Sequence, residues 1–230
     1  MGHVIAIDGP AGAGKSTIAR LLADKLDYTY IDTGAMYRAV ALWARQTETT
    51  ASEPAKLEQL AQSAEIALLP PNRVWLNGRD VTDSIRTPEI SGLASQVAAI
   101  GGVRAALVVK QRQIAEHANV VMEGRDIGSI VFPDARVKIF LAADPAARVL
   151  RRAGETPGGE TQALAAQLAE RDRRDRNRAE SPLVQAPDAV YLDSTGLSTE
   201  EVQEAVLRVV RERISNGKPA DTPGGKEQTA

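Results

Sequence analysis

The chain has 230 residues and a formal net charge of −2; 43% of its residues are hydrophobic, 25% are charged, none is cysteine and two are histidine. This balance is ordinary for a globular protein, and it gives no overall attraction to nucleic acid or to an anionic membrane. The lack of cysteine excludes disulfides, thiolate catalysis and cysteine-bound zinc, and no apolar run approaches the ~20 residues that span a bilayer. We therefore expect a cytoplasmic protein that binds neither nucleic acid nor membrane and, because no segment suggests an obligate interface, a monomer.

A glycine-rich stretch between a predicted strand and a predicted helix is the first motif. Residues 4–7 are a short, mostly β-branched apolar run typical of a buried parallel strand, and apolar residues recur at helical spacing over 18–26. Between them lies Gly9-Pro10-Ala11-Gly12-Ala13-Gly14-Lys15-Ser16-Thr17, with the spacing G-x-x-x-x-G-K-[ST]. The N–H groups of such a loop surround phosphate oxygens. We expect Lys15 to reach the β- and γ-phosphates of a nucleoside triphosphate, and the Ser16 hydroxyl to coordinate Mg²⁺.

Strands and helices alternate along the rest of the chain. Apolar runs predict strands over 28–32, 120–123, 137–141 and 190–192. Helical spacing predicts helices over 33–44, 57–65, 146–152, about 161–179 and 198–214, and two helices within 89–119 that Gly101-Gly102 divides. Residues 46–56 are polar and contain a proline, which indicates a loop. The pattern predicts an α/β fold with a five-stranded, mostly parallel sheet and helices on both faces.

Residues 66–88 differ from this pattern. Apolar runs at 67–69 and 74–76 are followed by Asn77-Gly78, a strong hairpin signal, and by another short run at 80–82. We expect a small antiparallel insertion within the α/β body. Either a rigid unit or a mobile substrate arm fits this composition.

In parallel sheets of this kind, ligands bind beyond the carboxyl ends of the strands. That rule brings together the loop at 9–17, the segments 32–38 and 124–126, the chain after Asp144, and Asp193. We expect the functional site at this edge.

Two predicted helices near this edge are rich in arginine. Residues 170–178 contain five arginines, and one helical face carries Arg171, Arg174, Asp175 and Arg178. The preceding helix carries arginines at the same spacing, namely Arg148, Arg151 and Arg152. A flexible, glycine-rich connector at 154–160 joins the two helices. One interpretation is a solvated face with ion pairs. Beside a phosphate loop we favour another, a lid at about 146–178 that covers polyphosphate and excludes water, as a kinase of a small acceptor requires.

Several motifs together resemble the bacterial cytidylate kinases. Besides the loop at 9–17 they are Asp32-Thr33-Gly34-Ala35-Met36-Tyr37-Arg38, Ala94-Ser95-Gln96-Val97-Ala98, Gly124-Arg125-Asp126-Ile127-Gly128, Val131-Phe132-Pro133-Asp134-Ala135, and 171–178 followed by Pro182-Leu183. The resemblance covers residue 4 to about 214. It implies transfer of the γ-phosphoryl group of ATP to CMP or dCMP with Mg²⁺. It further implies a P-loop nucleotide-kinase fold in a single domain over 1–214, with the insertion at 66–88 on the nucleoside monophosphate side, whereas we expect 215–230 to be a disordered tail.

The resemblance also assigns roles position by position. On the donor side, the loop motif and the lid arginines themselves predict the ATP contacts, which we expect at Gly9, Pro10, Ala11, Gly12, Ala13, Gly14, Lys15, Ser16 and Thr17 of the loop, and at Arg148 and Arg151 of the lid. On the acceptor side, cytosine contacts fall on Ser95, Arg104 and Asp126, phosphate contacts on Thr33, Arg38, Arg125 and Arg178, ribose contacts on Arg171 and Asp175, and a further substrate contact on Tyr37. The catalytic set is Lys15, Arg125, Arg152 and Arg178.

The chemistry of cytosine suits the three base contacts. A carboxylate such as Asp126 accepts from the N4 amine, while Arg104 and the Ser95 hydroxyl can donate to the O2 and N3 acceptors. Uracil presents a carbonyl oxygen where cytosine has that amine, so it would face Asp126 without a hydrogen bond. Asp175 would accept from a ribose hydroxyl, with neighbouring arginines holding it ionised.

Two other functions share parts of this pattern. A sister kinase of another nucleotide or of a shikimate-like alcohol would use the loop and the lid, but not Ser95, Arg104 and Asp126 as a set. A nucleotide-binding switch protein with no second substrate would not need the lid arginines. The chain departs from the family at Ser16, where many members have glycine, and in a short lid segment near 154–161, which leaves open which lid arginine contacts ATP.

Overall fold

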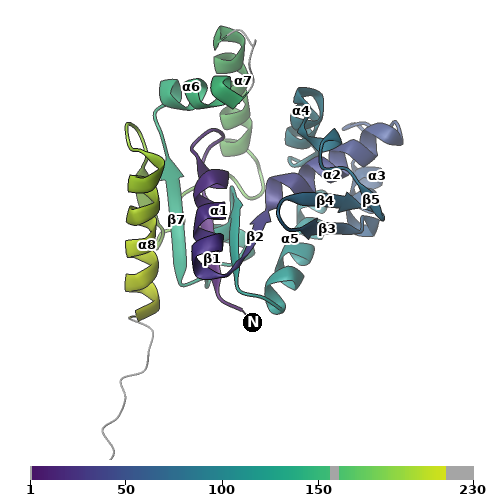
Figure 1. Ribbon diagram of the computed structural model, residues 1–230. Helices are drawn as coiled ribbons and strands as arrows, with labels where there is room; N and C mark the ends of the chain where they lie inside the picture. Colours follow the sequence, from purple (N-terminus) through teal and green to yellow (C-terminus); the bar gives the residue numbers. More distant parts are fainter. Residues whose placement is uncertain (1, 156–160, 216–230) are drawn as a thin grey trace, which may run out of the picture.

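The computed structural model describes residues 2–155 and 161–215, and its centre is a parallel β-sheet (Figure 1). The strands are β1 (Val4–Asp8), β2 (Thr29–Asp32), β6 (Val120–Gly124), β7 (Val137–Ala142) and β8 (Val190–Asp193). They lie in the order β2-β6-β1-β7-β8, and every neighbouring pair is parallel. The predicted five-stranded sheet is confirmed, with β1 as its central strand.

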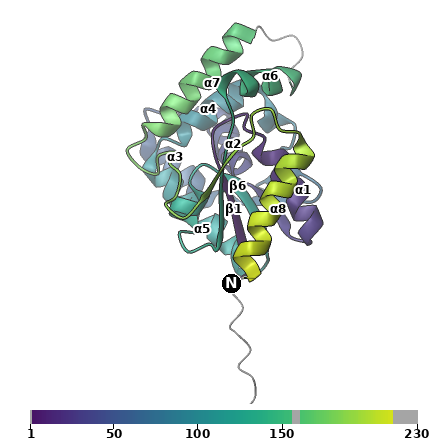
Figure 2. The same cartoon turned by 90° about the vertical axis from the view of Figure 1, so that its left-hand side faces the viewer.

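Helices cover both faces of the sheet because its strands are apolar on both sides. The covering elements are α1 (Lys15–Leu26), α5 (Gly101–Glu116), the π-helix η2 (Ile127–Val131) and α8 (Thr199–Ser215). Ile5 and Ile7 of β1 pack with α1 and α8, which run along the sheet in Figures 1 and 2. Ala6 faces the other way, toward η2 and the end of α5. Successive side chains of one strand therefore serve two separate core layers.

A second group of elements lies beside the β2 edge. It contains α2 (Thr33–Gln46), α3 (Pro54–Ser63), α4 (Pro88–Val97), a 3₁₀ turn (Ser84–Arg86), and the antiparallel strands β3 (Ile66–Leu69), β4 (Arg73–Leu76) and β5 (Arg79–Asp80). Apart from the exposed β5, these elements and α5 share one hydrophobic cluster. The predicted small antiparallel sheet is confirmed, with its strands within residues 66–80. Its turn uses Asn77 and Gly78 with φ of 49° and 76°, the left-handed pair that a tight hairpin requires.

Three predicted helix boundaries are wrong. Residues 46–56 are not all loop, because α3 begins at Pro54, where the fixed φ of proline suits the first helical position. The helices within 89–119 separate at residues 98–100, and Gly101 is the first residue of α5 rather than the break. The last predicted residues of the arginine helix are not helical, since α7 (Thr161–Arg176) ends before Arg178.

Helices α6 (Pro145–Glu155) and α7 stand above the carboxyl ends of the strands (Figures 1 and 2). The side chains of Val149 and Leu168 join them in a small cluster that also contains Ala11 of the phosphate loop. The arginine-bearing helices therefore pack directly on the loop. Most of the connector predicted at 154–160 and the tail predicted beyond 215 lie outside the described residues.

Within residues 2–155 and 161–215, no single helix is long and apolar enough to cross a membrane. Helices α4 and α5 meet the same criterion only as a pair, and they are bent by 101° at the break between them. Both contribute buried residues to the core beside the small sheet.

Candidate active site

The phosphate loop joins the central strand to α1, and its path depends on glycine. Gly9, Gly12 and Gly14 have φ of 148°, 76° and 90°, which side chains rarely adopt. A Cβ on Gly9 would lie 2.0 Å from the carbonyl oxygen of Leu141 in β7. The loop can therefore turn tightly against the sheet and lead directly into the amino end of α1, the end of a helix that favours anions.

A polar cavity of about 520 Å³ lies between this loop, α2, the end of β6 and α7. Its lining includes Lys15, Ser16, Thr17, Arg38, Arg125, Arg152 and Arg171 from the predicted set, with Asp32 and Glu123 from the ends of β2 and β6. Cations and carboxylates thus face one space. The hydroxyl of Ser16 and the two carboxylates are oxygen ligands of the kind that Mg²⁺ prefers.

Lys15 lies in this cavity with 4% of its surface exposed, and its Nζ donates to the Pro10 carbonyl oxygen at 2.7 Å. Burial, and then the neighbouring Arg125, lowers the pKa of Lys15 to about 7. Burial and the nearby Asp32 raise the pKa of Glu123, whose Oε1 accepts from the Tyr30 hydroxyl at 2.5 Å. These groups are held where a bound phosphate or metal ion would change their protonation.

Next to this cavity is a small pocket of about 50 Å³ between α2, α4, α5 and α7. Nine of the ten predicted substrate residues line it: Thr33, Tyr37, Ser95, Arg104, Arg125, Asp126, Arg171, Asp175 and Arg178. The tenth, Arg38, lines the larger cavity, where its Nη2 pairs with Asp32 at 2.8 Å. The structure thus gathers residues that are up to 145 positions apart (178 − 33) in one place.

The predicted base contacts form the inner end of this pocket. Arg104 donates to the Asp126 carboxylate, and both side chains are almost fully buried. The Arg104 guanidinium also lies 5.5 Å from the centre of the Tyr37 ring. Among the described residues, the buried Ser95 Oγ has no hydrogen-bond partner. A buried hydroxyl without a partner is a group that a ligand can satisfy.

The predicted phosphate and ribose contacts meet at Asp175. Its carboxylate accepts from Arg125 Nε at 2.9 Å and from Arg178 Nη2. Burial alone would raise the pKa of Asp175, but the charges of Arg125, Arg178 and Arg171 hold it below its usual range. For Arg171, burial and the charge of Arg125 lower the pKa to about 10. The pocket is therefore rich in cations that would be stabilised by an anion.

The three arginines of α6 have three different surroundings. Arg148 is buried, and its Nη1 donates to the Ala11 carbonyl oxygen at 3.0 Å and to Asp172 at 2.6 Å. Arg151 donates to Oγ and to the carbonyl oxygen of Ser194 at 2.9 and 2.7 Å, beside a cavity of about 280 Å³ on the outer side of the loop. Arg152 lines the large polar cavity. Arg148 lines neither of these two cavities, whereas Arg151 lines one and Arg152 lines the other.

The arginines at and just beyond the end of α7 also fall into two groups, one in ion pairs with Glu170 and one in the pocket. Arg174 pairs with Glu170 at 3.3 Å, and Arg173 pairs with the same carboxylate at 2.8 Å. These two residues form the partly solvated ion-pair face that the alternative interpretation describes. Arg171 and Arg178 instead line the pocket.

Sequence reasoning missed several residues of the site. Asp32 lies in the segment 32–38 that we expected at the carboxyl edge of the sheet, but it was given no role. Glu123 ends a predicted strand, so the rule about carboxyl ends could have identified it. Asp172, the partner of Arg148, gave no such signal, because it lies one position off the face that the helical spacing selected. Asp8 directly follows the first predicted strand and was given no role, yet it is buried and its carboxylate accepts from two backbone N–H groups of η2.

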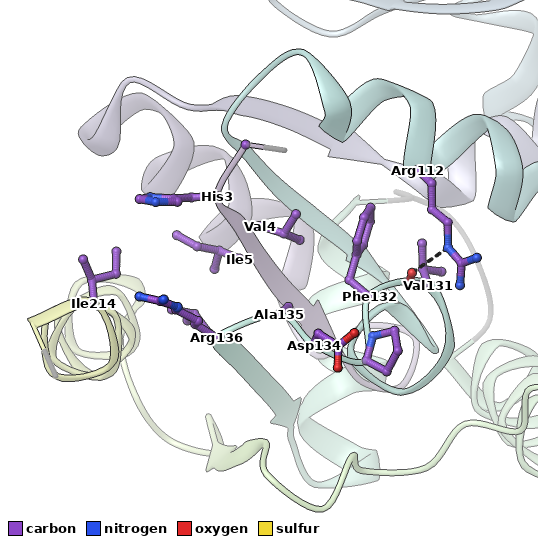
Figure 3. Close-up of a pocket in the computed structure, with 13 residues that line it drawn as sticks. His3, Val4, Ile5, Arg112, Val131, Phe132, Asp134, Ala135, Arg136 and Ile214 are labelled. Carbon is purple, nitrogen blue, oxygen red and sulfur yellow. Dashed lines mark hydrogen bonds between the residues drawn. The ribbon is translucent and has the colours of Figure 1, made fainter. Parts of the chain in front are cut away.

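An apolar cavity of about 500 Å³ lies at the opposite, amino end of the strands (Figure 3). His3, Phe132, Arg136 and Ile214 are among its lining residues, and Arg112 Nε beside it donates to the Val131 carbonyl oxygen at 2.9 Å. None of the predicted site residues lines this cavity.

Comparisons with known proteins show which family this chain resembles. A family model described as Cytidylate kinase matches residues 5–212. A cytidylate kinase of Solibacter usitatus (strain Ellin6076) is 58% identical over 221 residues, which cover 94% of this chain and 95% of that protein. A bifunctional pantoate ligase/cytidylate kinase of Synechococcus sp. (strain JA-2-3B'a(2-13)) is 44% identical over 94% of this chain and 42% of that protein. Among solved structures, an uncharacterized protein from Eubacterium ventriosum ATCC 27560 matches 90% of this chain and 98% of its own with a TM-score of 0.53 at 13% identity.

Proposed function

The chain belongs to the cytidylate kinase family, and from this we propose how its residues carry out the transfer of the γ-phosphoryl group of ATP to CMP or dCMP. The enzyme is a kinase, and the products are ADP and CDP or dCDP. An oxygen of the acceptor phosphate forms the new bond to the γ-phosphorus, and the bond from that phosphorus to the leaving ADP oxygen breaks. The acceptor oxygen is already anionic near neutral pH, so no general base is required.

On the donor side, the phosphate loop holds the triphosphate of ATP. The glycine conformations support this role, and so does the position of the loop at the amino end of α1. Lys15 and Arg152 face the polar cavity from two sides and would neutralise charge on the transferred group. Ser16 would hold Mg²⁺ in the cavity that Asp32 and Glu123 also line, and the ion would neutralise negative charge on the phosphates.

The adenine of ATP would occupy the cavity of about 280 Å³ beside Arg151. This cavity adjoins the loop at Gly12, Gly14 and Thr17, so a nucleoside there is continuous with phosphates on the loop. Of the two lid arginines assigned to ATP, Arg151 is therefore the one that we propose contacts the nucleotide. Arg148 would instead fix α6 on the loop and on α7.

On the acceptor side, the observation that carries the proposal is the gathering of nine predicted substrate residues in one pocket. The Asp126 carboxylate would accept from the N4 amine of cytosine, and Arg104 would donate to an acceptor atom of the base, so the two residues would give up part of the hydrogen bonding between them. The Ser95 hydroxyl would gain the partner that it lacks. Arg125 and Arg178, with Arg38 and Thr33 nearby, would hold the phosphate of CMP between the pocket and the polar cavity. Arg171 and Asp175 would contact the ribose.

Catalysis in this arrangement comes from positioning and from charge. The phosphate-binding arginines lie between the two substrates, so they can stabilise the charge that spreads over the transferring group. Helices α6 and α7 stand over the same space and would keep out water, which would otherwise accept the γ-phosphoryl group.

An acceptor panel tests this function. ADP release should be measured with ATP, Mg²⁺ and, in turn, CMP, dCMP, UMP, AMP, GMP and shikimate. We expect the highest kcat/KM for CMP or dCMP, with UMP at least tenfold lower because of the Asp126 carboxylate. A preference for shikimate or for a purine nucleotide would favour a sister kinase, and ADP release that no acceptor accelerates would favour a binding protein.

The wider organisation is also part of the proposal. Residues 1–214 would act as one catalytic domain, and the enzyme would work as a monomer in the cytoplasm without binding nucleic acid or membrane. The ten predicted acceptor residues line two adjoining spaces within one chain, so the proposed site would need no residue of a second copy. Light scattering after size exclusion would test it, and a dimeric mass in the presence of both substrates would contradict it.

A further inference from the structure

The start of the π-helix η2 is capped in an unusual way. The first N–H groups of a helix have no partner within it, and the side chain of the preceding residue normally accepts from them. Here that residue is Asp126, but its side chain makes no cap hydrogen bond. It is turned instead toward Arg104 in the acceptor pocket.

Asp8 supplies the missing acceptors from the end of β1. Its Oδ1 accepts from the Ile127 N–H at 2.8 Å, and its Oδ2 accepts from the Gly128 N–H at 2.7 Å. A Cβ on Gly128 would lie 3.4 Å from that Oδ2 and 3.2 Å from the Lys138 side chain, so glycine keeps this approach open. Asp8 is 6% exposed, and it immediately precedes Gly9, the first residue of the phosphate loop.

A carboxylate in this position is not favoured by its surroundings. Burial raises the pKa of Asp8 to about 6, although both N–H groups oppose the rise. Lys15 lowers this pKa, and Asp126 raises it further. A buried acid that is held beside another acid calls for a reason beyond packing.

We propose that Asp8 is a positioning residue for base recognition: it caps η2 in place of Asp126 and so leaves the Asp126 carboxylate free to face the cytosine. Aspartate side chains readily bond to the N–H groups that follow them. Without Asp8, the Ile127 and Gly128 N–H groups would lose their acceptors, and the side chain of Asp126, which is at the N-cap position, would turn away from the pocket to accept from them. This inference rests on the proposed role of Asp126 in reading cytosine.

The test uses Asp8→Asn, which keeps the size of the side chain but turns one acceptor into an amide that faces an N–H donor. We expect the ratio of kcat/KM for CMP to that for UMP to fall about tenfold, the loss typical of one weakened base contact. The KM for ATP should change less than about twofold, since the Asp8 carboxylate bonds to η2 and not to the phosphate loop. Glu201→Ala is the matched control, because it removes a carboxylate that caps α8 through the Ser198 N–H at 2.8 Å and should leave the ratio unchanged.

A double-variant cycle separates this inference from the proposed function. If Asp8 acts through Asp126, then Asp8→Asn should have no further effect on the ratio in an Asp126→Asn background. Additive losses, or equal losses for CMP and UMP in the single variant, would overturn the inference while leaving the base-reading role intact. An unchanged ratio in Asp126→Asn alone would instead refute that role. Melting curves accompany each variant, and if Asp8→Asn does not fold, Asp8→Ser, which keeps one acceptor, takes its place in the same cycle.

Discussion

Ser95 illustrates how single atoms of this protein are placed for a ligand. Its side chain is 4% exposed in the acceptor pocket, and its Oγ has no hydrogen-bond partner among the described residues. A buried hydroxyl without a partner destabilises the free protein, because it has lost its bonds to water. The same atom becomes useful when cytosine presents an acceptor to it.

Ser95→Ala should therefore separate stability from activity. We expect the free energy of unfolding to stay the same or to rise by up to ~1 kcal/mol, while kcat/KM for CMP falls about tenfold. Ser129→Ala is a matched control, because Ser129 Oγ is another buried hydroxyl without a partner among the described residues, but it does not line the pocket. Urea unfolding and steady-state kinetics measure both effects. A clear loss of stability in Ser95→Ala would mean that the hydroxyl already has a partner in the free protein.

The ammonium group of Lys15 should link ATP binding to pH. Its pKa is about 7 in the free protein, mainly because of burial, and the phosphates of bound ATP would raise that pKa. Above pH 7, ATP binding must then be accompanied by proton uptake, so the Kd for ATP should increase as the pH rises. At pH 6 the group is already protonated and this dependence should vanish. Titration calorimetry in two buffers with different ionisation enthalpies measures the protons taken up.

Lys15→Arg is the control for this pH effect. Arginine keeps its charge over the whole range, so the variant should take up close to no proton at pH 8, even if its affinity is lower. Proton uptake of the same size in both proteins would assign the effect to another group, such as Glu123 or Asp8.

At the scale of elements, the contact between α6 and α7 rests on a buried ion pair. Arg148 and Asp172 are 7% and 8% exposed, and Arg148 also bonds to the phosphate loop through the Ala11 carbonyl oxygen. The pair therefore connects three segments that surround the donor phosphates. An arginine left without its partner in such a place is strongly unfavourable.

Asp172→Ala should loosen this junction. We expect a loss of stability of about 3 kcal/mol, faster amide exchange in α6 and α7, and a lower kcat, since the donor phosphates lose their fixed surroundings. Glu170→Ala, which removes the exposed partner of Arg173, is the control and should change stability by less than about 1 kcal/mol. If exchange in α6 is unaffected by Asp172→Ala, then the apolar cluster of Val149 and Leu168 holds the helices without the ion pair.

Elements with a strong apolar pattern were predicted well, for a physical reason. Strands such as β6 and β7 are buried on both faces, so their uninterrupted apolar runs mark them within one residue. The hairpin turn was equally plain, because Asn77 and Gly78 suit left-handed dihedrals. The start of α3 was missed because Pro54 can both break a helix and begin one.

Side-chain partners were harder to predict than elements. Helical spacing placed Arg148 with Arg151 and Arg152, but only the tertiary packing of α7 on the loop gives Arg148 a buried partner in Asp172. The cap that Asp8 provides links residues 119 and 120 positions apart, and no local pattern encodes it. The acceptor residues were named from a family resemblance; spacing alone would not have joined Ser95 to Asp126.

For the molecule as a whole, the relation between the three spaces at the carboxyl edge matters most. The cavity beside Arg151 shares Gly12 and Thr17 with the polar cavity. The acceptor pocket shares Gly34, Gly124, Arg125 and Arg171 with that same cavity. The proposed sites for adenine, phosphates and cytosine therefore adjoin one another in a single row.

This continuity predicts that one molecule can occupy the whole row. A compound with adenosine and cytidine joined through five phosphates should bind more tightly than ATP or CMP alone by a factor on the order of 10² to 10⁴, because its second half binds at high effective concentration. Calorimetry gives the affinity, and the diadenosine compound with the same five phosphates is the control. In Asp126→Asn, affinity for the cytidine compound should fall toward that control, since only the base contact differs. Binding no tighter than that of ATP would mean that the donor and acceptor phosphates do not meet in the polar cavity.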